Sequence, residues 1–196
     1  MVKLALTTLR IFAISATAGS VAGRKTDTEA TTPFSLESWA SGIIADPDGA
    51  HPSPDEAFTL AVNQTETDSG ALEKRVVRCN TVAGTSASAA DAVWCIDFLA
   101  RRPGQRCGVG AGGRSSFCHH GLATIQGVSS YPVWKGGSSP PWYTLPSKVS
   151  PIIIDVSGNV ARSAGRIMDK CTRGGTVQGV NTAYGNGYLS VHIRRP

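Results

Sequence analysis

The distribution of cysteine constrains this 196-residue chain more than any other feature of its sequence. All five cysteines lie between residues 79 and 171, and the first 78 residues contain none. Cysteines gathered in one short segment are typical of a small domain that disulfides hold together in an oxidising compartment. Five cysteines form at most two bridges and leave one thiol over, and the sequence leaves their pairing open. They are Cys79, Cys95, Cys107, Cys118 and Cys171.

The charge of the chain changes at the same boundary. Residues 1–75 carry six basic and ten acidic side chains, whereas residues 76–196 carry thirteen basic and four acidic ones. An acidic segment without cysteine, followed by a basic segment with five, indicates two parts of the chain that are processed differently. The basic part suits an anionic partner, such as phospholipid, cell-wall polymer or nucleic acid.

Residues 1–22 have the parts of a secretory signal peptide. Lys3 precedes a short apolar region, and small residues end the segment at Ala22. This pattern predicts cleavage after Ala22 and a secreted, extracellular protein. An amphipathic transit peptide is the alternative, because the segment is rich in Thr, Ser and Ala and has no acidic residue. No apolar run reaches the roughly 18 residues that a membrane span requires, so we expect no stable membrane insertion.

Residues 23–75 are predicted to be an acidic, disordered pro-segment. They are rich in Thr, Ser, Asp, Glu and Pro, and their few bulky apolar side chains cannot offset the entropy of ordering. Asn63 begins a glycosylation sequon. Lys74 and Arg75 form a dibasic pair where processing proteases of the secretory pathway cut, which predicts 76–196 as the mature protein. On this hypothesis the acidic leader shields the basic domain until cleavage.

The mature segment is predicted to form a disulfide-stapled α+β fold, a two-layer α/β sandwich with two helices on one face of an antiparallel sheet. Apolar residues recur at helical spacing from Ala92 to Leu99 and from Val160 to Cys171. The Asn186-Gly187 turn is expected to join the last two strands. The expected strands are 76–79, 117–128, 177–180 and 187–194, and 108–113 is expected to be a glycine-rich turn.

Residues 131–151 do not fit this pattern. The segment combines five prolines with Trp134, Trp142 and Tyr143. One interpretation is an exposed aromatic loop, in which these three side chains form the candidate contact surface for a partner or a bilayer interface. The alternatives are an insertion without a role and an intron retained in the gene sequence.

Two short motifs resemble a known group of proteins. They are Met168-Asp169-Lys170-Cys171-Thr172-Arg173-Gly174-Gly175 and Ala183-Tyr184-Gly185-Asn186-Gly187-Tyr188-Leu189-Ser190-Val191. A helix that ends in Cys, a glycine-rich turn and a Gly-x-Leu-x-Val strand resemble small cysteine-rich secreted proteins of filamentous fungi, with a likeness to the killer-toxin-like α/β sandwich. The resemblance implies a fungal effector or toxin. It also implies a sixth cysteine just before the second helix, where this chain has Ile152-Ile153-Ile154-Asp155.

The residues favour a binding protein over an enzyme. We interpret Asp91 as a helix-start residue, and Asp97 and Asp169 as solvated helix residues, so a glycosidase pair is not expected. No metal or other cofactor is predicted, because no CxxC motif occurs. The prediction is a non-enzymatic secreted effector, associated with virulence, that binds a host protein or an anionic cell-surface component. We expect a monomer, with a dimer through the odd cysteine as the alternative.

Two other functions stay open. The killer-toxin likeness implies an antifungal protein that acts on competing cells. A secreted ribonuclease-like enzyme would gather histidines and arginines around a phosphate. The candidates for such a site are His119, His120, His192, Arg114 and Arg194, of which His192 and Arg194 share the outward face of the last strand. Nucleic acid is not the partner that we favour, because the other positive residues are scattered along the chain.

Overall fold

The computed structural model describes residues 33–63, 77–130 and 152–196. Within these ranges the helices are α1 (Leu36–Ala45), α2 (Pro54–Val62), α3 (Ala89–Ala100) and α4 (Ser157–Cys171). The strands are β1 (Arg78–Cys79), β2 (Ala87–Ser88), β3 (Arg106–Gly110), β4 (Arg114–His120), β5 (Ala123–Ser129), β6 (Ile152–Val156), β7 (Thr176–Val177), β8 (Gly179–Thr182) and β9 (Leu189–Arg194). None of the helices in the described ranges has the length and apolar character needed to cross a membrane.

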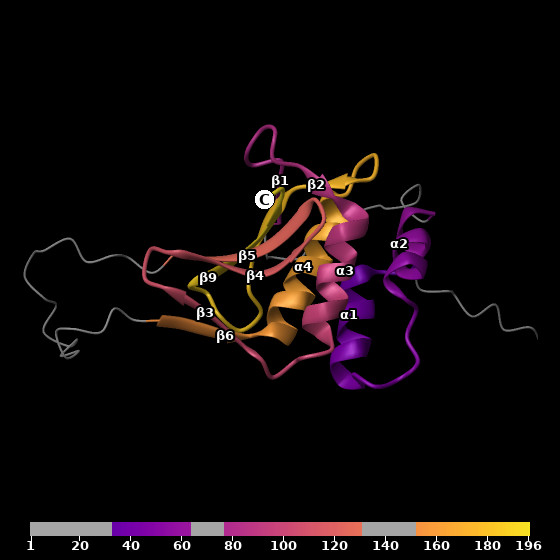
Figure 1. The fold of residues 1–196 in the computed structure, drawn as a ribbon, viewed down its shortest axis with the longest axis horizontal. Helices are drawn as coiled ribbons and strands as arrows, with labels where there is room; N and C mark the ends of the chain where they lie inside the picture. The colour runs from indigo at the N-terminus through magenta and orange to yellow at the C-terminus, as the bar shows by residue number, and fades with distance from the viewer. Residues whose placement is uncertain (1–32, 64–76, 131–151) are drawn as a thin grey trace, which may run out of the picture. The chain divides into compact units, whose positions relative to one another are not determined.

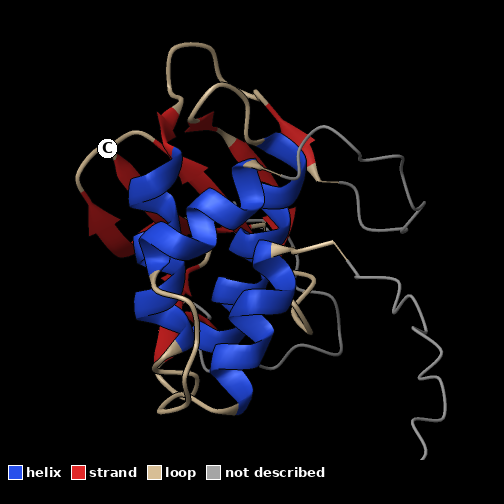
Figure 2. Ribbon diagram, turned by 90° about the vertical axis from the view of Figure 1, so that its right-hand side faces the viewer, coloured by secondary structure: helices blue, strands red, loops and turns tan. Residues whose placement is uncertain are grey.

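A five-stranded antiparallel sheet in the order β1-β8-β9-β5-β4 forms the base of the domain. Helices α3 and α4 pack on one face of this sheet, and Figure 1 shows the strands, then α3 and α4, then α1 and α2. Seen from the helix side, the helices lie in front of the strands (Figure 2). The predicted α+β sandwich, with its antiparallel sheet and two helices on one face, is confirmed.

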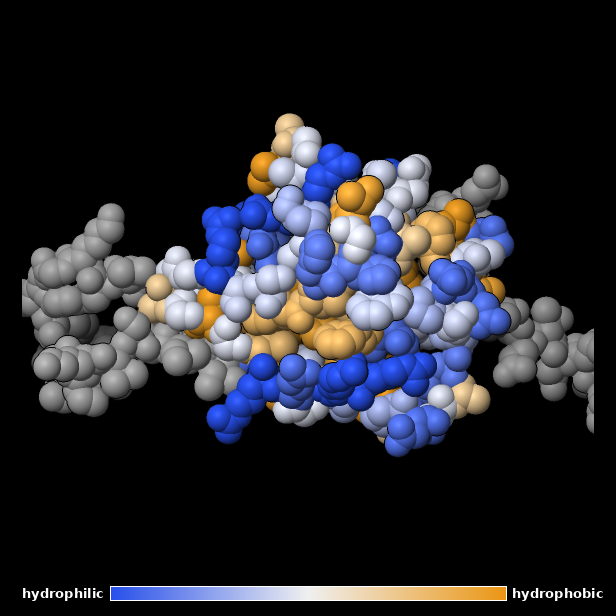
Figure 3. Space-filling model, in the orientation of Figure 1, coloured by the Kyte–Doolittle hydropathy of each residue, from blue (hydrophilic) through white to orange (hydrophobic). Residues whose placement is uncertain are grey.

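The core lies between the sheet and the α3–α4 layer. Leu189, Val191 and Ile193 alternate along β9 and are fully buried, because every second side chain of a strand points to the same face. Ile96 of α3 and Ile167 of α4 are buried opposite them in the same cluster. In the view of Figure 3, apolar residues gather in the middle, over α4, and hydrophilic residues border them.

Two disulfides connect the helix layer to the sheet. Cys79–Cys171 joins β1 to α4, and Cys95–Cys118 joins α3 to β4. The prediction of two bridges and one leftover thiol is confirmed. The free thiol is that of Cys107 in β3, which is only 4% exposed. A disulfide to a second chain would require Cys107 to leave the core, so the structure does not favour the dimer alternative.

Two of the strand and turn predictions need correction, and one strand was not predicted. Segment 117–128 is a β4–β5 hairpin and not a single strand, because Gly121 turns the chain with a φ of +48°. The Asp91 carboxylate fixes this turn by accepting a hydrogen bond from the Leu122 amide at 2.8 Å. The first half of the predicted turn at 108–113 belongs to β3, and residues 111–113 connect β3 to β4. Strand β6, which pairs with β3, was not predicted.

The prediction of disorder over 23–75 is wrong for residues 33–63, which form α1 and α2. The Ser35 side chain caps α1, and Ser53 and Glu56 form a capping box at the start of α2. The buried residues of α1 recur at the spacing of an amphipathic helix; they are Leu36, Trp39, Ala40 and Ile43. This regular spacing lets a short, mostly apolar helix within the acidic segment bury a continuous apolar stripe.

Candidate anion-binding face

Several predicted site residues cannot be placed in the fold. Those outside the described residues are Ala22, Lys74, Arg75, Trp134, Trp142 and Tyr143. Asn63, the predicted glycosylation acceptor, is the C-cap of α2 and is exposed. The histidines and arginines of the phosphate-site alternative all lie in the described part, so their arrangement can be examined.

The face of the five-stranded sheet that points away from α3 and α4 carries a group of basic side chains. Leu189, Val191 and Ile193 face the helices, so the residues that alternate with them in β9, including His192 and Arg194, point to the other side. The pairing register places one residue from each strand in a single row across the sheet. This row is Arg78, Val180, His192, Gln126 and Ser116.

The two neighbouring rows complete the pattern. In one of them Arg194 lies opposite Thr124, and in the other Arg114 lies opposite Val128. His192 therefore occupies the middle of the sheet, with an arginine on each side of it and one further along its own strand. We call Arg78, Arg114, His192 and Arg194 the basic face.

The three arginines lie close enough to His192 to change its protonation. Burial, as the largest cause, and then the positive charges of Arg194, Arg114 and Arg78, in that order of importance, together lower the pKa of His192 to about 4. The imidazole is therefore neutral at neutral pH, where the three guanidinium groups keep their charge. An anion bound here would be attracted by the arginines and could accept a hydrogen bond from the neutral ring.

Gln126 supplies a second observation that points to a ligand. It lies opposite His192 in the central row, is only 6% exposed, and its side-chain Nε2 has no hydrogen-bond partner within the described structure. A buried N–H donor without an acceptor costs about 1–3 kcal/mol. A ligand that brings an oxygen acceptor to the basic face would remove this cost.

Residues 74–140 and 148–195 match the model of a family described as a domain of unknown function, DUF8794. The chain belongs to the DUF8794 family. Neither the curated proteins nor the solved structures include a match. The DUF8794 match begins at Lys74, the first residue of the predicted cleavage pair. It includes all four residues of the basic face and leaves α1 and α2 outside it.

The histidines of the DUF8794 domain do not form one cluster. His119 shares the outer face of the sheet but lies two strands from β9, opposite Thr124. His120 points to the helix side, where its ring stacks on Trp94 at 4.2 Å and its Nε2 lies 3.8 Å from Asp91. Sequence reasoning found Arg114, His192 and Arg194, but it missed Arg78 and Gln126.

The basic face carries positive charge on strands that have no acidic residue. None of the five strands of this sheet contains Asp or Glu. With a pKa of about 4, His192 is a weak general base at neutral pH. In the part of the chain that the structure describes, no group of three or more His, Cys, Asp or Glu side chains comes together that could hold a metal ion. The arrangement thus suits electrostatic binding of an anion better than proton transfer.

The aspartates of the helices have structural roles, one of which differs from the prediction. Asp91 lies at the start of α3, where its amide donates to the Ser88 side chain, as predicted. Asp97 pairs with Arg101 at 3.1 Å near the surface. The prediction that Asp169 is solvated is wrong, because its carboxylate is largely enclosed where α4 meets the start of α1.

The described part of the acidic leader does not cover the basic face. Helix α1 packs against α4 and α3, and α2 packs against α3, on the opposite side of the sheet (Figure 1). The hypothesis that the leader shields the basic residues is therefore wrong for residues 33–63. The structure leaves the leader helices a different role, since they cover an apolar surface.

Proposed function

We propose that this protein is a secreted, non-enzymatic effector whose DUF8794 domain binds an anionic partner through the basic face. The observation that carries the proposal is the grouping of Arg78, Arg114 and Arg194 around His192, a neutral group at neutral pH. Arginine is the side chain best suited to phosphate, sulfate and carboxylate groups, because its planar fork donates two parallel hydrogen bonds. The partner that we favour is an anionic component of a target cell surface.

Secretion is supported by two features of the chain. Residues 1–22 have the pattern of a signal peptide, and two disulfides of the DUF8794 domain suit an oxidising compartment. The dibasic pair lies where the family match begins, which supports removal of the leader at Lys74 and Arg75. The role as an effector delivered to a host follows only from the resemblance to small secreted fungal proteins.

The proposal is tested by retention on an immobilised sulfated polysaccharide. We expect the variant R78Q/R114Q/R194Q to elute at much lower salt than the wild type, because each lost contact reduces the number of counterions released on binding. The matched control R102Q/R106Q/R173Q removes the same net charge from exposed positions in loops and in β3. It should elute much closer to the wild type.

Two results would contradict the proposal. Equal elution of the two triple variants would mean that overall charge, and not the basic face, causes retention. Retention of the wild type that does not depend on salt would exclude an electrostatic contact altogether.

One observation supports the alternative of a ribonuclease-like activity. Arg114, His192 and Arg194 lie on the same face of the sheet. Incubation of the purified protein with RNA tests this activity, with His192→Ala as the control. Cleavage that disappears in this variant would replace binding by catalysis as the function, and intact RNA would remove the alternative.

A further inference from the structure

We infer that the outer surface of α3 and α4 is a preformed receptor for the leader helices, and that residues 33–63 stay bound to it as a separate chain after cleavage. Only the cleavage itself rests on the proposed function. The docking rests on contacts between segments that lie on either side of the predicted cleavage pair. The ligand of this surface is thus a polypeptide, residues 33–63 of the same chain, which includes the amphipathic helix α1.

The first argument is the amount of apolar surface that the two parts share. Leu36 and Trp39 of α1 are only 2% and 5% exposed, and Ala57 of α2 is fully buried. These side chains belong to the same cluster as the buried residues of α3 and α4. Because α1 and α2 lie outside the DUF8794 match, this family domain carries an apolar surface that its own residues do not cover.

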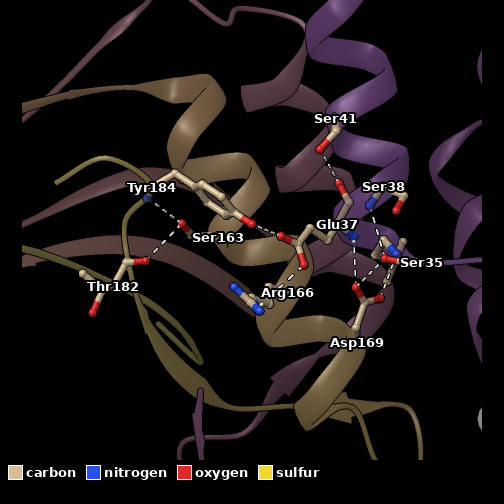
Figure 4. Close-up of polar contacts among 10 residues, drawn as sticks. Ser35, Glu37, Ser38, Ser41, Ser163, Arg166, Asp169, Thr182 and Tyr184 are labelled. Atoms are coloured by element: carbon tan, nitrogen blue, oxygen red, sulfur yellow. Dashed lines mark hydrogen bonds and ion pairs between the residues drawn. The ribbon is translucent and has the colours of Figure 1, made fainter. Parts of the chain in front are cut away.

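The second argument is a set of polar contacts that fixes the position of α1 on α4 (Figure 4). The Asp169 carboxylate accepts hydrogen bonds from the Leu36 amide at 2.7 Å, the Ser35 hydroxyl at 2.8 Å and the Glu37 amide at 3.1 Å. It therefore satisfies amide groups that the first turn of a helix leaves without partners. A carboxylate at this end also complements the helix dipole.

Glu37 makes the reciprocal contacts. Its carboxylate lies 3.8 Å from the Nε of Arg166, a buried residue three positions before Asp169 in α4. The Tyr184 hydroxyl donates a hydrogen bond to the other Glu37 oxygen (Figure 4). The Asp169 carboxylate of the domain thus contacts the amino end of α1. In return, Glu37 of α1 contacts Arg166 and Tyr184 of the domain. This complementarity selects one register of the leader helix.

The third argument is a glycine inside α4. A Cβ built on Gly165 would lie 2.7 Å from the Leu36 carbonyl oxygen and 2.8 Å from the Glu37 Cα, both of them backbone atoms. Glycine in the middle of a helix is unfavourable relative to alanine. At this position it lets the backbone of α1 lie directly on α4. The close approach of the leader therefore accounts for a residue that weakens the helix of the domain.

The contacts have a consequence for the processed protein. The leader segment has no cysteine, so after cleavage only these non-covalent contacts would hold it. The leader helices lie on the helix side of the domain, so they stabilise that side and do not cover the basic face. Loss of the leader would uncover an apolar surface together with Arg166 and Asp169.

The test is cleavage of the purified full-length protein in vitro with a protease specific for Lys-Arg, followed by native size exclusion and intact mass. We expect the leader fragment and the domain to elute together and to separate in denaturant. Gly165→Ala should release the leader at least tenfold more readily, although alanine is the better helix residue. Gly158→Ala is the matched control, because its Cβ would meet Pro103 and not the leader.

Separation of the wild-type fragments under native conditions would overturn the inference, as would equal release from the Gly165→Ala and Gly158→Ala proteins. If Gly165→Ala does not fold, Glu37→Ala removes the contacts to Arg166 and Tyr184 without changing the domain, and it should also release the leader. The proposal that the chain is cleaved during secretion has a separate test: an uncut chain in the culture medium would contradict it. The docking inference does not depend on that result, because the test of docking uses cleavage in vitro.

Discussion

Replacing Asp155 with cysteine should close a third disulfide, to Cys107. The two residues are direct partners in the antiparallel β3–β6 pair, and paired residues in such strands have Cα atoms about 4.5–5.5 Å apart. Disulfides accept Cα separations of about 4.4–6.8 Å. Cys107 already holds a buried free thiol, and this is the place where the resemblance implied a sixth cysteine.

The size of the effect follows from the loop that the new bridge would close. The chain-entropy relation gives about 4 kcal/mol for a loop of the length between residues 107 and 155. The substitution also removes hydrogen bonds that Asp155 accepts from the Val156 amide and the Asn159 side chain, each at 2.8 Å. These losses cost about 1 kcal/mol each, so the net gain in the free energy of unfolding should be about 2 kcal/mol.

Urea unfolding of three proteins measures this gain. Asp155→Ala is the control, because it loses the same hydrogen bonds without supplying a thiol, and oxidised Asp155→Cys should exceed it by about 4 kcal/mol. Intact mass with thiol labelling establishes whether the bridge has formed. Two thiols that stay free in the folded variant would refute the pairing of β3 with β6. A bridge that adds no stability over Asp155→Ala would refute the loop argument.

Three further predictions concern other parts of the chain. Removing the Cys79–Cys171 bridge, which spans 92 residues, should lower the free energy of unfolding by about 4.6 kcal/mol in urea; a loss below 1 kcal/mol would contradict the entropy argument. Because the pKa of His192 falls from 6.5 to about 4 on folding, stability should decline as pH drops through this range, by about 1 kcal/mol after allowance for solvent screening. His192→Gln should lose that part of the pH dependence, and an unchanged profile would contradict the burial of the ring. Replacing Lys74 and Arg75 should leave the leader covalently attached, so an unchanged mass of the secreted protein would exclude cleavage there.

Local patterns predicted the parts of the fold that depend on neighbouring residues. Helix α4 and strand β9 followed from apolar spacing. Strand β9 buries one face against the helices, whereas α4 is covered by the sheet on one side and by α1 on another. Composition gave the wrong result for α1, because the average over residues 23–75 is polar although α1 itself has only Glu37, Ser38 and Ser41 as polar side chains. The helical spacing of the apolar residues in α1 is present in the sequence, but the polar composition of the whole segment 23–75 outweighed it in the prediction.

The site depended on relations that a single sequence does not contain. Arg78 joins the basic face only because β1 pairs with β8, and Gln126 reaches the central row only through the register of β5 with β9. Both pairings connect residues far apart in the chain. The interpretation of Asp169 failed for the same reason, because its partner helix lies more than a hundred residues away.

The most direct test of anion binding is an NMR titration of the full-length protein with a short sulfated oligosaccharide. The account predicts saturable shifts at Arg78, Arg114, Gln126 and Arg194, and a rise in the pKa of His192 above about 4, because a bound anion favours the protonated ring. Shifts confined to other surfaces, or a His192 pKa that the oligosaccharide does not change, would contradict it.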